Sequence, residues 1–182
     1  MNNQLSTTEK NLLLKIARES IVNYIMKGSK PALDVSSEGL LTKQGCFVTI
    51  KHKGNLRGCI GQFTSDKPLC QLVQEMAIAA ATHDPRFYPM VVEDLQNFDL
   101  EISILSPLKK IDSIDEIEVG VHGLYIEKNS YRGVLLPQVA TEYGWDRYTF
   151  LSQTCLKAGL DKEAWKDDAD IHIFSAQVIE EK

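Results

Sequence analysis

The segment Leu56-Arg57-Gly58-Cys59-Ile60-Gly61 combines residue types that could do chemistry. It places a cation, a thiol and two glycines within six positions of an otherwise apolar run. Glycine weakens a strand, so this pair indicates a bend or the close approach of another group to the backbone. On a regular strand, Arg57 and Cys59 would point to one face about 6–7 Å apart, because side chains alternate with a rise of ~3.3 Å per residue.

Two interpretations of Cys59 follow. An arginine beside a partly exposed cysteine favours the thiolate, which makes Cys59 a candidate nucleophile and Arg57 its activating cation. Alternatively, Cys59 is a small apolar core residue, because free cysteines are often buried. The internal repeat described below favours the core interpretation, since Val134 occupies the matching position.

A second candidate is His83-Asp84-Pro85-Arg86-Phe87, which follows a predicted helix. An imidazole, a carboxylate and a guanidinium meet there in an irregular segment, the kind of segment that often carries function. His83 could be a general base oriented by Asp84, with Arg86 as a binding residue. The alternative is an ordinary helix C-terminus, with a histidine that compensates the helix dipole and a proline that ends the helix. The sequence leaves both open.

A third candidate lies between Pro137 and Trp145. Gln138, Glu142 and Trp145 supply a carboxamide, a carboxylate and an aromatic ring, which a binding pocket could use. Equally, Gln138 and Glu142 are one turn apart on the solvated side of a short helix while Trp145 packs in a core.

Composition excludes several classes of protein. The net charge of -5 and the scattered lysines and arginines argue against nonspecific nucleic-acid binding. The four cysteines and four histidines show no zinc-ligand spacing, so no metal is expected. The N-terminus has no signal segment, and apolar runs such as Ala77–Ala81 are too short to cross a bilayer. We therefore expect a cytoplasmic protein with reduced thiols and no membrane association.

Several elements must position these residues. Ser6 and Glu9 predict a capping box for a helix over about 7–27, which Gly28 ends. A loop over 29–44 precedes a hairpin of 46–51 and 56–63, turning at Lys53-Gly54-Asn55. An apolar stripe from Pro68 predicts a helix that stops at 84–85, and alternation over 98–104 predicts a strand with one wet face.

The second half repeats this order, with a hairpin of 123–127 and 131–136, a helix capped by Asp146 and a strand over 171–179. At an offset of 75 residues, Arg57-Gly58 falls on Arg132-Gly133. We therefore predict an internal duplication of about 45–107 and 120–180. Because the Arg-Gly pair recurs, it indicates a structural role, such as a close backbone approach at the centre of the sheet. Alternatively, either arginine could bind a carboxylate or a phosphate. We expect one domain over 1–182, of class α+β, with a single mostly antiparallel sheet covered by helices.

The motifs Leu56–Gly61, Asp84–Phe87, Leu135–Ala140 and Gly144-Trp145, in this order, resemble the AMMECR domain family. The resemblance covers nearly the whole chain and is strongest to the prokaryotic AmmeMemoRadiSam system protein A subgroup. One departure is Tyr88-Pro89-Met90, where many members have Phe-Pro-Pro-Val, so we expect a differently shaped loop after Arg86.

The resemblance implies a single antiparallel sheet built from a duplicated unit, and an activity that is not settled. It also implies that Arg57, Gly58, Cys59 and Gly61 mark a functional surface, without indicating a cofactor. Two hypotheses follow. The first is an enzyme, or the substrate-handling subunit of one, with Cys59 in a cleft between the halves. The second is a noncatalytic adaptor for a Memo-type protein or a radical SAM protein.

Overall fold

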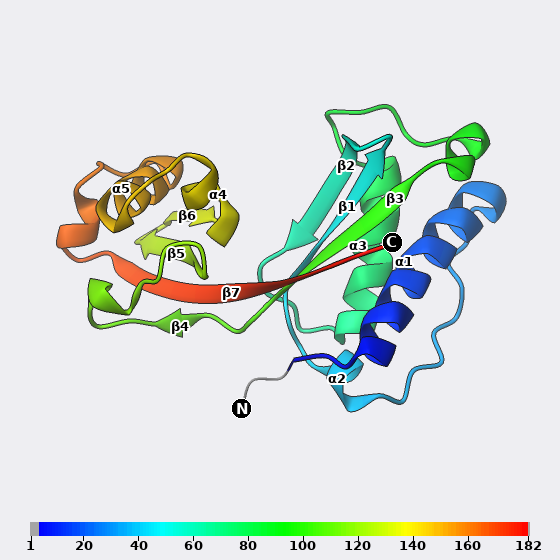
Figure 1. Ribbon diagram of the computed structural model, residues 1–182, viewed down its shortest axis with the longest axis horizontal. Coiled ribbons are helices and arrows are strands. Elements are labelled where there is room, and N and C mark those ends of the chain that lie inside the picture. The colour runs from blue at the N-terminus through cyan, green and yellow to red at the C-terminus, as the bar shows by residue number, and fades with distance from the viewer. Residues whose placement is uncertain (1–3, 182) are drawn as a thin grey trace. The chain divides into compact units, whose positions relative to one another are not determined.

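The computed structural model describes residues 4–181 (Figure 1), which divide into two compact units. The first unit runs to Leu105 and takes in the chain from Gln177 onward, and the second is Ser106–Ala176. Helices and antiparallel strand pairs make up both units, so the predicted α+β class is confirmed.

The first unit opens with α1 (Thr7–Lys27). The Glu9 N–H donates to Ser6 Oγ at 3.3 Å and the Ser6 N–H donates to the Glu9 carboxylate at 2.8 Å, which confirms the capping box. Gly28 adopts a left-handed φ of 69° and ends the helix as predicted. The segment expected to be a loop contains one extra helical turn, α2 (Glu38–Leu41), whose Leu40 is buried in the core.

The sheet of the first unit places β1 (Cys46–His52) between β2 (Asn55–Gln62) and β3 (Asp99–Leu105). Lys53 and Gly54 both have positive φ, as the tight turn of a two-residue hairpin requires. The helices α1 and α3 (Leu69–Thr82) contact each other and this sheet, and they share its apolar core. The fully buried core side chains include Val48, Ile50 and Ile102.

The hairpin of the first unit contains an irregularity that the sequence did not predict. Ile50 pairs with Gly58, but Lys51 pairs with Leu56, so Arg57 is an extra residue without a partner on β1. Such a bulge bends the strand and changes the direction of its side chains. The expectation of a regular strand through Arg57 and Cys59 is therefore wrong at Arg57.

The second unit has its own core, and its strands belong to the same antiparallel sheet as those of the first unit, so the predicted single sheet is confirmed. Its strands are β4 (Lys109–Lys110), β5 (His122–Lys128), β6 (Tyr131–Leu135) and the first part of β7 (Asp170–Glu180), and β7 pairs with both β4 and β5. Asp146 accepts a hydrogen bond from the Thr149 N–H at 2.7 Å, which confirms it as the cap of α5 (Arg147–Lys157). A shorter helix, α4 (Pro137–Glu142), precedes α5. Three short 3-10 turns complete the chain: η1 (Val92–Gln96), η2 (Ile114–Glu116) and η3 (Ala164–Lys166).

The glycines of the recurring Arg-Gly pairs have the same packing role in each unit. A β-carbon on Gly58 would lie 2.2 Å from the Ala80 carbonyl oxygen of α3, and one on Gly133 would lie 2.6 Å from the Thr154 carbonyl oxygen of α5. In both cases a helix backbone packs directly on the second hairpin strand, and only glycine leaves the space. The shared order of hairpin, helix and strand supports the internal duplication, which stays a prediction.

We predict that Gly58→Ala and Gly133→Ala each lower the free energy of unfolding by about 1–3 kcal/mol, the usual cost of overpacking. The neighbouring atoms belong to the backbone or, at Gly133, also to the Cβ of Ala158, so no flexible side chain can move aside. Urea denaturation measures the effect. Gly54→Asn is the matched control, because nothing lies within 4 Å of a β-carbon there and asparagine tolerates positive φ. A midpoint for Gly58→Ala equal to that of the wild type would contradict this packing.

Candidate functional site

The candidate site of the first unit is built on the free edge of β2. This strand is the outermost of its sheet, so backbone groups on its outer side have no strand to pair with. At Cys59, the side chains of Asp84 and Arg86 bind the backbone groups that a further strand would otherwise pair with. The Cys59 N–H donates to Asp84 Oδ2 at 2.8 Å, and the Cys59 carbonyl accepts from Arg86 Nη2 at 3.2 Å.

Asp84 holds this arrangement together. Its Oδ1 accepts from the Arg86 N–H at 3.1 Å and from Arg86 Nε at 2.9 Å, and its Oδ2 lies 2.7 Å from Arg86 Nη2. The Asp84 side chain is 2% exposed, whereas that of Arg86 is 54% exposed. The Arg86 guanidinium, aided by the Cys59 N–H, holds the pKa of Asp84 far below its ordinary value although burial opposes this.

The cation that binds Cys59 is Arg86 and not the predicted Arg57, and its contact is with the Cys59 backbone carbonyl. Thr49, which pairs with Cys59 across the hairpin, has its Oγ1 3.2 Å from Cys59 Sγ. The pKa of Arg86 is raised, chiefly by Asp84 and with a smaller contribution from Cys59. Cys59 is half-buried, while Cys46, Cys70 and Cys155 are buried, so the interpretation of Cys59 as a core residue is wrong.

The side chain of Arg57 binds elsewhere. Its Nη2 lies 3.2 Å from Asp94 Oδ2 in η1, and the same oxygen accepts from the Val91 N–H at 3.0 Å. Its Nη1 is buried and has no hydrogen-bond partner among residues 4–181. Arg57 therefore ties the start of β2 to η1.

His83 and Asp84 are not paired. His83 is exposed at the end of α3. Its backbone N–H donates to the Ala79 carbonyl at 2.7 Å, and its ring Nδ1 lies 2.6 Å from Thr82 Oγ1. Asp84 directs its oxygens to Cys59 and Arg86 instead. The geometry agrees with the helix-end interpretation, and no hydrogen bond from Asp84 orients the imidazole within the described chain.

The two glycines of the motif also have steric roles. A β-carbon on Gly61 would lie 2.3 Å from the Cys46 carbonyl oxygen and 2.4 Å from the ring of Phe47. Gly61 thus allows β1 and β2 to pair closely beside an aromatic side chain, as Gly58 allows α3 to pack on β2.

The third group of candidates belongs to the second unit. Gln138 and Glu142 are exposed on α4, as the solvated-face interpretation expects. Trp145 is half-buried against the core of that unit, and its ring stacks on Tyr143 with centroids 4.9 Å apart. His172 pairs with Tyr125 across the strands β5 and β7, and the two rings lie edge-on with centroids 5.6 Å apart.

Residues that the sequence did not indicate complete the first group. Thr49 contacts the thiol, and Asp94 receives Arg57. A regular two-residue hairpin starting at His52 and Asn55 would pair Thr49 with Gly58, and only the bulge moves its partner to Cys59. The sequence therefore predicted the turn of the hairpin but not the one-residue shift in the pairing of β1 and β2.

Within residues 4–181, no cluster of three or more histidine, cysteine, aspartate or glutamate side chains is arranged to hold a metal ion. The helices in that part of the chain are also too short or too polar to cross a membrane.

We predict that Asp84→Asn destabilises the protein by about 1–3 kcal/mol near neutral pH, because it weakens buried hydrogen bonds. The depressed pKa sets the sign of the pH dependence. The contribution of the carboxylate is fully present above the unfolded value of about 4 and is lost as pH falls toward the folded pKa. Stability measured by denaturation from pH 6 to pH 2 should thus fall more steeply for wild type than for the variant. Parallel curves would contradict this assignment.

We also predict that Cys59 is alkylated fastest of the four cysteines, because it alone is half-buried while the others are buried. Burial also raises the pKa of Cys46 to about 12 and raises that of Cys155. Limited treatment with iodoacetamide, followed by peptide mass spectrometry, gives the order of modification. If Cys59 reacted only when the protein unfolds, as expected for the buried Cys46, its thiol would be inaccessible in the folded protein. A nucleophilic role of Cys59 would then be excluded.

Comparison with known proteins places the chain in a family. The family model described as AMMECR1 matches residues 14–179. The protein MK0488 of Methanopyrus kandleri is 41% identical, over 100% of this chain and 93% of its own length. A protein of Methanothermobacter thermautotrophicus is 44% identical over 97% of this chain and 96% of its own length. The crystal structure of the uncharacterized protein PH0010 from Pyrococcus horikoshii superposes with a TM-score of 0.83 at 36% identity, over 98% of this chain and 94% of that one. The chain therefore belongs to the AMMECR1 family.

Proposed function

We propose that this protein is a noncatalytic binding domain that holds a partner protein beside the β2 edge. One observation carries the proposal: large apolar side chains are exposed around the bridge formed by Asp84 and Arg86. The exposed fractions are 91% for Tyr88, 54% for Val91, 52% for Val92 and 44% for Leu56. We call these four residues the 88–92 surface.

Two anchors hold the 88–92 surface in place. Arg57 binds Asp94, which also accepts from the Val91 N–H, so Leu56 lies beside the segment that carries Val91 and Val92. Arg86 binds the Cys59 carbonyl, which fixes the chain two residues before Tyr88. A clustered, positioned apolar surface is typical of protein interaction sites, and tyrosine is enriched among the residues that dominate binding energy.

The groups that catalysis would need have structural partners in the same region. Asp84 binds backbone and Arg86, Arg57 binds Asp94, and His83 lies beside Thr82. No acid, base and nucleophile meet within hydrogen-bonding reach of one another among these candidates in residues 4–181. This arrangement favours binding over catalysis.

An enzyme, or the substrate-handling subunit of one, is the second candidate function. The observation in its favour is the half-buried Cys59, whose sulfur lies 3.2 Å from Thr49 Oγ1 and whose backbone carbonyl binds the Arg86 guanidinium. A neighbouring cation favours the thiolate form of a cysteine. In this hypothesis Arg86 takes the role that the sequence assigned to Arg57.

The resemblance to the AmmeMemoRadiSam system supplies two candidate partners, a Memo-type protein and a radical SAM protein. Either could be tested as a purified protein from the same organism. We expect one of them to cover the 88–92 surface and exclude water from Tyr88.

We predict that Tyr88→Ala weakens binding to that partner by about 30-fold, corresponding to about 2 kcal/mol for a residue that dominates an interface. Tyr148→Ala is the matched control, because Tyr148 is also exposed but lies on α5 of the second unit. Biolayer interferometry measures both. Equal affinities for wild type and Tyr88→Ala would contradict the proposal, whereas loss of binding with Cys59→Ser alone would favour a role for the thiol.

A further inference from the structure

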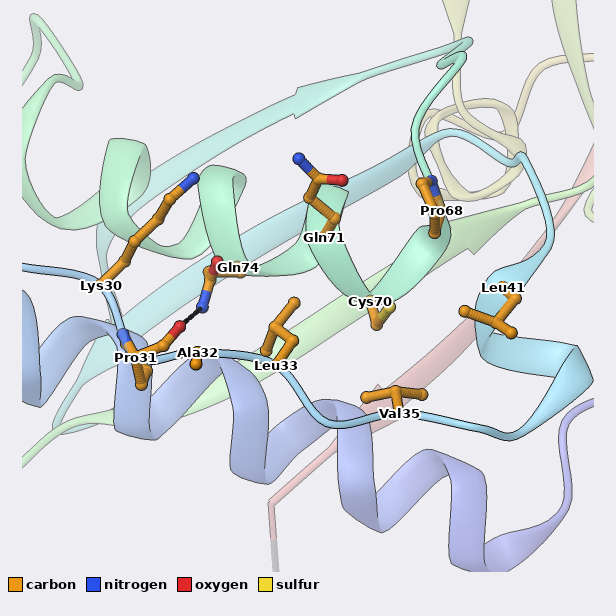
Figure 2. Close-up of a pocket in the computed structure, with 10 residues that line it drawn as sticks. All are labelled: Lys30, Pro31, Ala32, Leu33, Val35, Leu41, Pro68, Cys70, Gln71 and Gln74. Atoms are coloured by element: carbon orange, nitrogen blue, oxygen red, sulfur yellow. Dashed lines mark hydrogen bonds between the residues drawn. The ribbon is translucent and has the colours of Figure 1, made fainter.

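A separate pocket of the first unit lies beneath the segment Lys30–Ser36, which we call the strap. Figure 2 shows the strap running along the N-terminal half of α3, with the pocket between them. The pocket has a volume of about 350 Å³, within the usual range for small-molecule sites. It shares no lining residue with the 88–92 surface.

The pocket has an apolar end and a polar end. Leu33, Val35, Leu41 and Pro68 surround one end, and Cys70 lies on its floor (Figure 2). Lys30, Gln71 and Gln74 lie toward the other end. A ligand that fills this space must itself be apolar at one end and polar at the other.

Gln74 contributes its amide to the lining of the pocket. The residue is 2% exposed, and its Nε2 donates to the Pro31 carbonyl at 2.9 Å. Since a carbonyl can only accept, this bond fixes the amide orientation. The amide nitrogen carries a second N–H, which is the group of Gln74 that a ligand in the pocket would bind.

The charge at the polar end favours an anion. Lys30 Nζ lies 3.8 Å from Glu75 Oε1, and Lys67 Nζ lies 2.6 Å from Glu75 Oε2. Two ammonium groups therefore share one carboxylate, and of these three groups only Lys30 lines the pocket. A ligand carboxylate would lie beside Lys30 and accept from the second Gln74 N–H.

The strap is also held in a way that permits entry. Within the described chain its residues form no backbone-to-backbone hydrogen bonds, and the Pro31 carbonyl is held by the Gln74 side chain. A second hollow of about 180 Å³ lies on the other side of the strap, between it and α1. A segment with few backbone bonds and space on both sides opens at low free-energy cost.

We propose that the pocket beneath the strap binds a medium-chain aliphatic carboxylate, with the chain along Leu33, Val35 and Leu41 and the carboxylate beside Lys30 and Gln74. The volume suits a short acyl chain, and the polar groups at one end match its head group. The strap opens to admit the ligand and closes over its chain.

Cys70 provides a built-in reporter for the test. Its thiol lines the pocket, so decanoate should protect it from N-ethylmaleimide, and peptide mass spectrometry gives the rate for each cysteine. We expect saturating decanoate to slow modification of Cys70 about tenfold and to leave Cys59 unchanged. Cys46 is the reference for global opening, because it is buried in the core away from the pocket. Decyltrimethylammonium, which has the same tail with a cationic head, and acetate, which lacks the tail, should not protect Cys70.

Variants test the head-group site directly. We expect Lys30→Glu to weaken decanoate binding about tenfold in equilibrium dialysis, corresponding to about 1.4 kcal/mol. Lys27→Glu is the matched control, since Lys27 is exposed in the last turn of α1 and does not line the pocket. Absence of protection by decanoate would overturn the proposal. Equal protection by the cationic amphiphile, or equal binding by wild type and Lys30→Glu, would overturn the carboxylate assignment.

Discussion

The carboxylate of Asp84 is the interaction on which the rest of the candidate site depends. It is almost fully buried, and it binds the Cys59 N–H and the Arg86 guanidinium together. Open strand edges invite pairing with other chains, and here a buried carboxylate and its exposed arginine partner occupy the edge of β2. The same pair fixes the chain just before Tyr88, so the position of the exposed apolar residues follows from it.

Several residues whose types suggest catalysis have structural roles in this protein. Gly58 and Gly61 leave space for backbone atoms, Arg57 ties β2 to η1, and Asp84 covers an edge. A motif can therefore be chemically rich and still serve mainly to build a surface. Cys59 is the exception, because it is half-buried, its sulfur contacts Thr49, and it is not part of the buried core cluster.

The two proposed binding regions would hold their ligands by different interactions. The 88–92 surface projects apolar side chains into solvent and suits a large partner that buries them. The pocket beneath the strap is a small open hollow with an amide and an ammonium group at one end. A small amphipathic ligand in the first unit and a protein partner on its β2 edge can therefore be tested independently, since their contact residues do not overlap.

The sequence by itself determined the local elements and the family. The capping box at Ser6, the turn at Lys53-Gly54 and the Asp146 cap depend on neighbours within a few residues, so pattern was sufficient to predict them. Tertiary structure alone decided which side chains meet. The bulge at Arg57 is one unpaired residue, yet it moves the partner of Thr49 from Gly58 to Cys59 and directs Arg57 to Asp94. The contact of Arg86 with Cys59 and the pocket beneath the strap depend on where α3 ends and packs, which are long-range contacts that no local spacing encodes.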